Sequence, residues 1–365
     1  MRVILHVGPP KTGSSYIQEV LLTNTDLLLT MDWQLPVPGR LADRGDHGDL
    51  AYKPQDYLTE GEPGHANLAA LRGSQHNLIF SAEGLCYWKL SQFEALADIL
   101  GADHVDVVFF LRDPFATFYS TWREEVKHGN TRGLPEAFME HFADPSHSVV
   151  INPSLLLRNL AHLPKPFRLT VLPYDQFMAR GENIIDHIWY KTMRFTAPYR
   201  VARSNVNRSF PIGMSEFLRL LLQEYHARYP ATNLVEARIA FHKLYYESRD
   251  RKSIGLLPFG DSRNYNQRLN EAIDRVMDRK RTFIMRRDTG VHNFIRRQVH
   301  EEFGKFMPEP VSLEEIYAEG DVEFTYFNTE DLWKSRAIRR LLNDMIPAIR
   351  AHLTARANTR DVVNG

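Results

Sequence analysis

The run Val-Asp-Val-Val-Phe-Phe-Leu at residues 105–111 limits the possible folds more than any other part of the sequence. Its length suits a strand, and its apolar side chains occupy neighbouring positions instead of alternating with polar ones. A strand with this composition has both faces buried, as in a parallel sheet that helices cover on each side. The run therefore predicts an α/β protein.

Shorter apolar runs predict further strands, at residues 3–7, 77–81 and 168–172. Apolar residues at helical spacing predict helices after residue 14 and at residues 93–100, 114–127 and 155–163. Strands that alternate with helices form a parallel sheet with helices on both faces, which makes three layers. Residues 32–75 are rich in Gly, Pro, Asp and His and lack a sustained period, so we expect an irregular excursion there.

Beyond about residue 200 the strand pattern fades and amphipathic helical patterns replace it. The predicted helices lie at residues 214–229, 235–246, 265–283, 291–306 and 332–353. We therefore predict an α/β core at residues 1–200, and at residues 201–365 a largely helical region that completes the core.

Composition excludes some partners and locations. The 365 residues include 45 basic and 45 acidic side chains, so net charge favours neither nucleic acid nor a membrane surface as a partner. Cys86 is the single cysteine, which rules out an intrachain disulfide and fits a reducing compartment. No run reaches the ~18 apolar residues of a transmembrane segment, and the first apolar run is too short for a signal peptide. We expect a cytoplasmic protein.

The segment Gly-Pro-Pro-Lys-Thr-Gly-Ser-Ser at residues 8–15 connects the first predicted strand to its helix. Backbone N–H groups in such a turn, together with the positive end of the helix, attract anions. The lysine adds a full charge and the hydroxyls add donors. A simpler interpretation is a tight turn with serine caps and a solvated lysine. The candidate anion-binding residues are Pro10, Lys11, Thr12, Gly13, Ser14 and Ser15.

The position of the lysine separates two kinds of phosphate loop. A nucleoside-triphosphate loop reads G-x-x-x-x-G-K-[ST], with lysine directly after the second glycine. Here Lys11 precedes Gly13, so that template does not fit. Pro-Lys-Thr-Gly-Ser-Ser instead resembles the 5′-phosphosulfate loop of sulfotransferases that use PAPS (3′-phosphoadenosine-5′-phosphosulfate), where P-K-[TS]-G-[TS]-[TS] is the usual form.

A second motif lies after the run at 105–111, where Arg112 is followed by Ser120 eight residues later. The same family has an arginine at this strand end and a serine on the next helix, both on the donor's 3′-phosphate. An arginine offers a planar fork for two phosphate oxygens. Taken alone, the Arg-Asp-Pro segment favours a simpler interpretation, in which Arg112 pairs locally with Asp113 and Ser120 has no role in binding. Asn207 and Ser209 are similar to an Asn-x-Ser element of bacterial members.

The resemblance covers roughly residues 1–180 and is nearest to the bacterial, carbohydrate-modifying branch. It implies a P-loop-like sulfotransferase fold, PAPS as donor, PAP as product, no metal, and an acceptor hydroxyl on a carbohydrate or glycoconjugate. It also implies that Lys11 stabilises the bridging oxygen, while the loop amides with Ser14 and Ser15 hold the 5′-phosphate. The region 201–365 would then be a candidate for part of the acceptor site.

An acceptor alcohol needs a base to remove its proton. Glu83 follows the second predicted strand of the core, and His47 lies in the excursion at 32–75. The family uses Glu in some branches and His in others, so the resemblance leaves both residues as candidates. We favour Glu83. His6, within the first strand, is predicted to be a core histidine.

Two other functions remain open, a P-loop phosphotransferase that requires Mg²⁺, and a PAP- or glycan-binding protein without catalysis. Residues 249–300 contain 13 Lys and Arg against 6 Asp and Glu. Such a segment is either a groove for an anionic polymer or a set of solvated helix faces.

Overall fold

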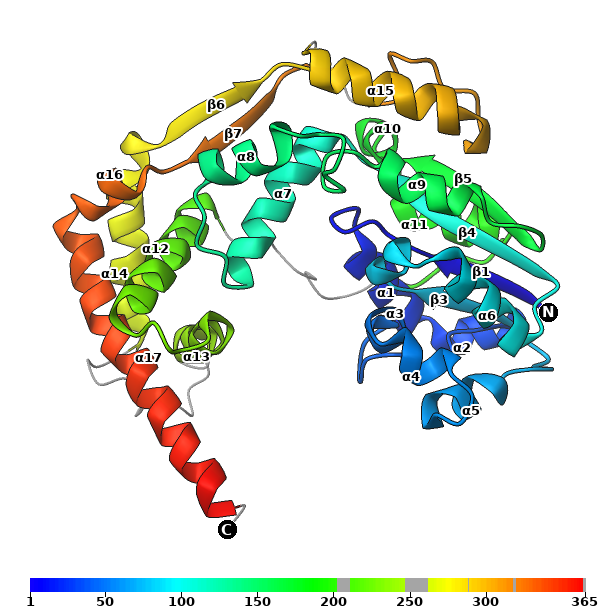
Figure 1. Cartoon of the computed structure of the whole chain (residues 1–365), viewed down its shortest axis with the longest axis horizontal. Coiled ribbons are helices and arrows are strands. Elements are labelled where there is room, and N and C mark those ends of the chain that lie inside the picture. Colours follow the sequence, from blue (N-terminus) through cyan, green and yellow to red (C-terminus); the bar gives the residue numbers. More distant parts are fainter. Residues whose placement is uncertain (202–210, 247–261, 288, 318–319, 364–365) are drawn as a thin grey trace. The chain divides into compact units, whose positions relative to one another are not determined.

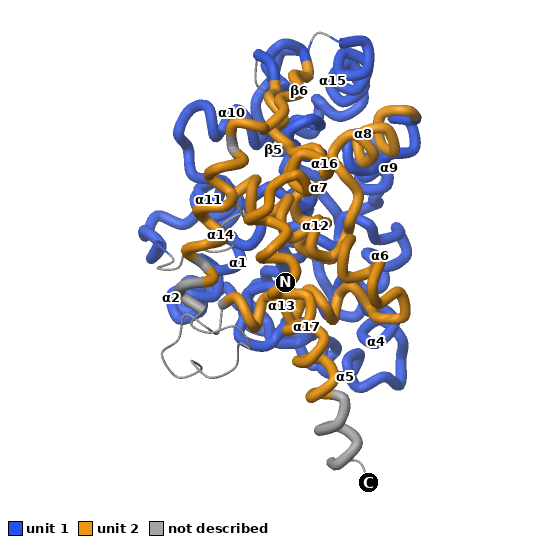
Figure 2. Tube along the Cα trace, turned by 90° about the vertical axis from the view of Figure 1, so that its left-hand side faces the viewer, with its two compact units in different colours: residues 1–118, 144–208, 286–321 blue, residues 119–143, 209–285, 322–365 orange. Residues whose placement is uncertain are grey.

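The computed structural model of the chain describes residues 1–201, 211–246, 262–287, 289–317 and 320–363. The chain forms two compact units (Figure 2). We call the first the sheet unit; it contains residues 1–118, 144–208 and 286–321. We call the second the helical unit; it contains residues 119–143, 209–285 and 322–365.

The sheet unit is built on five parallel strands in the order β2-β3-β1-β4-β5 (Figure 1). The strands predicted from the sequence are present within one or two residues of their expected bounds, and β2 is an additional edge strand. The strands are β1 (Arg2–His6), β2 (Trp33–Gln34), β3 (Asn77–Ser81), β4 (His104–Leu111) and β5 (Phe167–Pro173).

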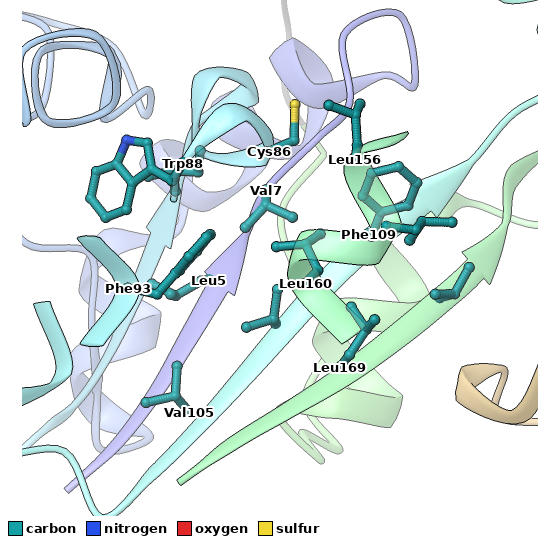
Figure 3. Close-up of a cluster of buried hydrophobic side chains, with 14 of the residues drawn as sticks. Leu5, Val7, Cys86, Trp88, Phe93, Val105, Phe109, Leu156, Leu160 and Leu169 are labelled. Atoms are coloured by element: carbon teal, nitrogen blue, oxygen red, sulfur yellow. The ribbon is translucent and has the colours of Figure 1, made fainter. Parts of the chain in front are cut away.

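Alternate residues of each strand enter different cores, which confirms that helices cover both faces of the sheet. On β4, Val107 and Phe109 belong to one cluster and Val108 and Phe110 to the other. In Figure 3, Leu160 of a covering helix lies among side chains of the first cluster. The helices of the sheet unit are α1 (Ser14–Thr23), α2 (Thr25–Thr30), α3 (Gly48–Tyr52), α4 (Pro54–Leu58), α5 (Pro63–Ala69), η1 (Glu83–Tyr87), α6 (Leu90–Leu100), α9 (Ser154–Ala161), α10 (Tyr174–Ala179), α11 (Ile184–Asp186), η2 (His187–Thr192), α15 (Gly290–Phe303) and η5 (Gly304–Phe306).

The excursion at residues 32–75 is more ordered than the sequence predicted. It contributes β2 and three helices of five to seven residues, α3, α4 and α5. Helices this short cannot display the repeated spacing that identifies a helix in a sequence. Leu50 and Leu68, from α3 and α5, are fully buried in the core of the sheet unit.

The helical unit has its own core, and the helices predicted at 214–229, 235–246 and 332–353 are present there within a few residues, the last of them divided into α16 and α17. The helix predicted at 291–306 is also present, but it belongs to the sheet unit. One prediction was wrong. The helix expected at 265–283 ends at Val276, and residues 281–285 form a strand that pairs antiparallel with a second strand, β7. The elements are α8 (Leu134–Phe142), α12 (Ile212–Arg228), α13 (Leu234–Tyr246), α14 (Ser262–Val276), η4 (Met277–Arg279), β6 (Arg281–Met285), β7 (Val322–Tyr326), α16 (Thr329–Trp333) and α17 (Arg336–Val363).

Helix α7 (Pro114–Lys127) begins in the sheet unit and continues into the helical unit after Phe118. Within the described parts of the chain, no helix combines the length and the apolar character needed to cross a membrane.

Candidate anion site at the carboxyl edge of the sheet

The candidate residues gather where the parallel strands end. Strand β1 is central, with β3 on one side and β4 on the other. The chain leaves β1 toward one edge of the sheet and leaves β4 toward the opposite edge, so a switch point lies between their carboxyl ends. In open α/β sheets the loops diverge at such a point and leave a crevice that commonly binds ligands. The loop at residues 8–13 follows β1, and Arg112 follows β4.

The loop after β1 has an unusual backbone. Gly8, Lys11 and Gly13 have φ angles of 84°, 71° and 81°. Glycine adopts this left-handed region readily, but for lysine it costs free energy, and such outliers persist where the surroundings enforce them, often at functional sites. A Cβ atom on Gly13 would lie 2.4 Å from Ile184 Cδ1, so the side chain of α11 closes directly over the loop.

Arg112 is in direct contact with this loop although the two are 101 residues apart in the sequence. Its Nη1 group donates a hydrogen bond to the carbonyl oxygen of Lys11. Its guanidinium carbon lies 5.3 Å from the ring centroid of Tyr174, a cation–π distance. Local pairing of Arg112 with Asp113, the alternative that the sequence left open, is not what is observed, because Asp113 is bound to other partners.

Two donors of this region are buried and lack a partner. Ser14 begins α1 with its side chain 1% exposed, and its Oγ atom has no hydrogen-bond partner in the described part of the chain. The Nε group of Arg112 is also buried and has no hydrogen-bond partner among the described residues. An unsatisfied buried polar group costs about 1–3 kcal/mol, and an anion oxygen would satisfy a donor of either kind.

The other loop residues differ in whether their side chains are accessible to a bound anion. Thr12 is fully buried, and its hydroxyl donates to the carbonyl oxygen of Pro9 at 2.7 Å, so it closes the loop on itself. Pro10, Lys11 and Ser15 are half-buried. Lysine 11 thus combines a strained backbone, a bonded carbonyl group and an accessible side chain.

Three further residues were predicted to bind the donor. Ser120 is half-buried on α7 and belongs to the helical unit, whereas Arg112 belongs to the sheet unit. Asn207 and Ser209 lie outside the described residues.

Asp113 organises a buried network that the sequence did not reveal. Its Oδ1 accepts hydrogen bonds from the N–H groups of Phe115 and Ala116 at 3.0 and 2.9 Å, which caps α7. Its Oδ2 accepts from Arg287 Nε at 2.8 Å and from His292 Nε2 at 2.9 Å. An Asp-Pro pair is a recognisable helix start, so the cap could have been predicted, but the partners of Oδ2 could not.

Two carboxylates of the network have pKa values that move in opposite directions. Burial would raise the pKa of Asp113, but the hydrogen bond from His292 and the charge of Arg287 outweigh it and hold this pKa below its ordinary value. Asp175 accepts a hydrogen bond from the N–H group of Asp113. Burial, followed by the charge of Asp113, raises the pKa of Asp175 to about 6.

His47 is fully buried, and both of its ring nitrogens are bound to backbone groups. Nε2 donates to the carbonyl oxygen of Pro36 at 3.0 Å, and Nδ1 accepts from the N–H group of Ser81 at 3.1 Å. Burial lowers the pKa of His47 to about 4. In this arrangement neither nitrogen is available to an acceptor hydroxyl, and the residue joins the excursion to the end of β3.

His6 is also buried, as predicted. Its Nδ1 lies 2.8 Å from Ser81 Oγ, while Nε2 has no partner among the residues described. Burial lowers the pKa of His6 to about 3, so the ring is neutral at physiological pH.

Glu83 is half-buried at the first position of η1, directly after β3. A Cβ atom on Gly8 would lie 3.0 Å from Glu83 Cα, so the start of the loop and the backbone of Glu83 are in close contact. Of the two candidate bases, Glu83 is the one that lies beside the anion-site loop with an accessible side chain.

Comparison of the chain with models of known families, with curated proteins and with solved structures finds no match. Within the described residues, no three His, Cys, Asp or Glu side chains gather as a metal site.

Proposed function

We propose that this chain is a sulfotransferase that moves the sulfuryl group of PAPS to an acceptor hydroxyl and releases PAP. The observation that carries the proposal is the hydrogen bond from Arg112 Nη1 to the carbonyl oxygen of Lys11. This hydrogen bond joins the loop at residues 8–15 to Arg112. Each of these two motifs resembles a donor-binding element of the family, and they lie far apart in the sequence. A donor with phosphates at both the 5′ and the 3′ position requires two such anion sites in one crevice.

The chemistry of the available groups fits this donor. The buried, unpartnered Ser14 Oγ and Arg112 Nε groups are donors of the kind that phosphate oxygens accept from. The amide groups at the start of α1 add the positive end of a helix. In this proposal, α1 with Ser14 and Ser15 holds the 5′-phosphate, and Arg112 holds the 3′-phosphate.

Transfer occurs by in-line displacement: the acceptor oxygen forms a bond to sulfur while the bond from sulfur to the bridging phosphate oxygen breaks. Lys11 stabilises the negative charge that develops on the bridging oxygen. Glu83 takes the proton of the acceptor hydroxyl. His47 is not proposed as the base, because both of its ring nitrogens are hydrogen-bonded to backbone groups.

The acceptor in this proposal is a carbohydrate or glycoconjugate, as the resemblance implies. Residues 201–365 stay a predicted candidate for part of the acceptor site. A cytoplasmic location accompanies the proposal, since the one cysteine, Cys86, is a free and buried thiol.

Donor identity is tested by calorimetric titration of the full chain with PAP and with ATP, each with and without Mg²⁺. We expect PAP to bind in the micromolar range or tighter regardless of Mg²⁺. Lys11→Ala and Arg112→Ala should each weaken PAP binding at least tenfold, because a charged hydrogen bond contributes about 1.5–3 kcal/mol. The matched control is Arg168→Ala, an exposed arginine near the amino end of β5, which should leave the affinity unchanged.

Tight ATP binding that depends on Mg²⁺, without PAP binding, would identify a phosphotransferase and overturn the proposal. Catalysis is tested separately, by screening glycans, lipids and small alcohols for sulfate uptake from labelled PAPS. Binding of PAP without transfer to any acceptor class would favour a binding protein without catalysis.

The base is tested with Glu83→Gln, which keeps the shape and removes the charge. We expect at least a hundredfold loss of turnover with little change in PAP affinity, in line with the usual effect of general bases. The control is Glu94→Gln, at an exposed position on α6. Turnover of Glu83→Gln at the level of the unmodified protein would remove Glu83 from this role.

A further inference from the structure

The helical unit contains an arginine-lined pocket between α14 and α17, with a volume of about 320 Å³. We call it the arginine pocket. Its lining includes four arginines and a single acidic residue, Glu271. Ala272 and Ala337 are small lining residues that leave space between the two helices. The arginines are Arg268 and Arg275 of α14 and Arg336 and Arg340 of α17.

Nearby carboxylates do not balance this charge. Arg268 donates to Asp344 at 3.0 Å, and Arg275 lies 3.9 Å from Glu271, beyond hydrogen-bonding distance and with both side chains largely exposed. Arg336 and Arg340 have no acidic partner in the described parts of the chain. Four guanidinium groups therefore face two carboxylates.

The arrangement is unfavourable for the helix that carries it. Helix α17 begins at Arg336 and has no acidic residue in its first turn. Its positive end therefore adjoins two further positive charges, and like charges four residues apart repel each other on a helix. A local arrangement that opposes stability without internal compensation is a common mark of a binding site.

We propose that the arginine pocket binds a sulfate or phosphate monoester of about the size of a sugar. Tetrahedral oxyanions offer several acceptor oxygens to guanidinium groups, which donate in a planar fork. The volume lies at the lower end of the range for small-molecule pockets, which suits a monosaccharide ester. Arg336 and Arg340 are the principal ligands, since Arg268 is already bound to Asp344. This inference does not depend on the identity of the donor in the sheet unit.

The experiment titrates the full chain, at low ionic strength, with glucose 6-sulfate, glucose 6-phosphate and neutral glucose. The test variant is Arg336→Gln/Arg340→Gln. The matched control is Arg339→Gln, which removes an exposed arginine from the same turn of α17 but does not line the pocket. We expect at least one ester to bind, and its affinity to fall at least tenfold in the double variant and less than twofold in the control.

Tighter binding of the sulfate ester would identify a sulfated saccharide as the ligand class, and tighter binding of the phosphate ester a phosphorylated one. The double variant should also melt at the same or a higher temperature without ligand, because it removes like charges from the positive end of α17. Binding of glucose equal to that of both esters, or equal losses in the control and the double variant, would overturn the proposal. PAP titration of the same variants separates this result from a failure of the donor assignment.

Discussion

Arg287 Nε donates a hydrogen bond to Asp113 Oδ2 at 2.8 Å, which joins residues 174 positions apart in the sequence. The same arginine donates from Nη1 to the carbonyl oxygen of Gly320 at 2.8 Å. All three residues lie close to points where the chain passes between the two units, after residues 118, 285 and 321. The guanidinium group of Arg287 therefore links three segments of the sheet unit, each close to a point where the chain continues into the helical unit. Asp113, one of its partners, directly follows Arg112 in the sequence.

Removing the guanidinium group of Arg287 should destabilise the sheet unit. Arg287→Met leaves the fully buried Asp113 with less compensation for its charge, so we expect a loss of about 3 kcal/mol in the free energy of unfolding. PAP affinity should also fall, since Asp113 is the neighbour of Arg112. Denaturant unfolding and calorimetry measure the two effects. Arg297→Met, at an exposed position on α15, is the control, and an equal loss in both variants would contradict the prediction.

Gly13 should not tolerate a side chain. In Gly13→Ala the new Cβ meets Ile184 Cδ1, and the φ angle of 81° is unfavourable for alanine. We expect a loss of about 2–4 kcal/mol, the sum of overpacking and left-handed strain, with weaker PAP binding. Gly61→Ala isolates the strain, because its φ is 94° and nothing lies within 4 Å of the added atom. Similar losses in the two variants would show that the contact with Ile184 has no effect.

Stability should fall in mild acid because of His47. Its pKa is lowered from 6.5 to about 4 by burial, so the unfolded chain binds the proton more readily than the folded one. The contribution is complete above pH 6.5 and is lost as the pH falls toward 4, with a total on the order of 3 kcal/mol. Urea unfolding at several pH values should show a shallower dependence for His47→Gln. The exposed His162→Gln variant should keep the full dependence.

The helical unit has a buried ion pair that permits an independent stability test. Arg219 Nε donates to Glu216 Oε2 at 2.6 Å with both side chains buried, and Glu216 also accepts from the N–H group of Phe327 at 2.9 Å. Arg219→Met leaves a buried carboxylate without its cation and should cost about 3–5 kcal/mol. The double variant Glu216→Met/Arg219→Met should recover part of that loss in a thermal unfolding experiment. Additive losses would show that the two charges are not coupled.

The parts of the fold that could be predicted are those specified by local patterns. The apolar run of β4 required burial on both faces, and its neighbours in the sheet followed from strand–helix alternation. Pro114 began α7 as expected. The two-stranded sheet of β6 and β7 was missed, because β6 is mostly exposed and its five residues follow a helix without a clear break. Only pairing with β7, which begins 37 residues after β6 ends, makes it a strand.

The candidate site also combines features that the local sequence determines with features that depend on tertiary contacts. The sequence by itself determined a glycine-containing loop at residues 8–15 between a strand and a helix, which is a candidate anion site, and an arginine at the end of another strand, since strand, glycine turn and helix start are local features. Only the tertiary structure decided that Lys11 and Arg112 touch, that Asp113 binds Arg287 and His292, and that His47 is buried with both nitrogens occupied. These are contacts between segments distant along the chain, and their free energies depend on burial and partners that no local pattern records.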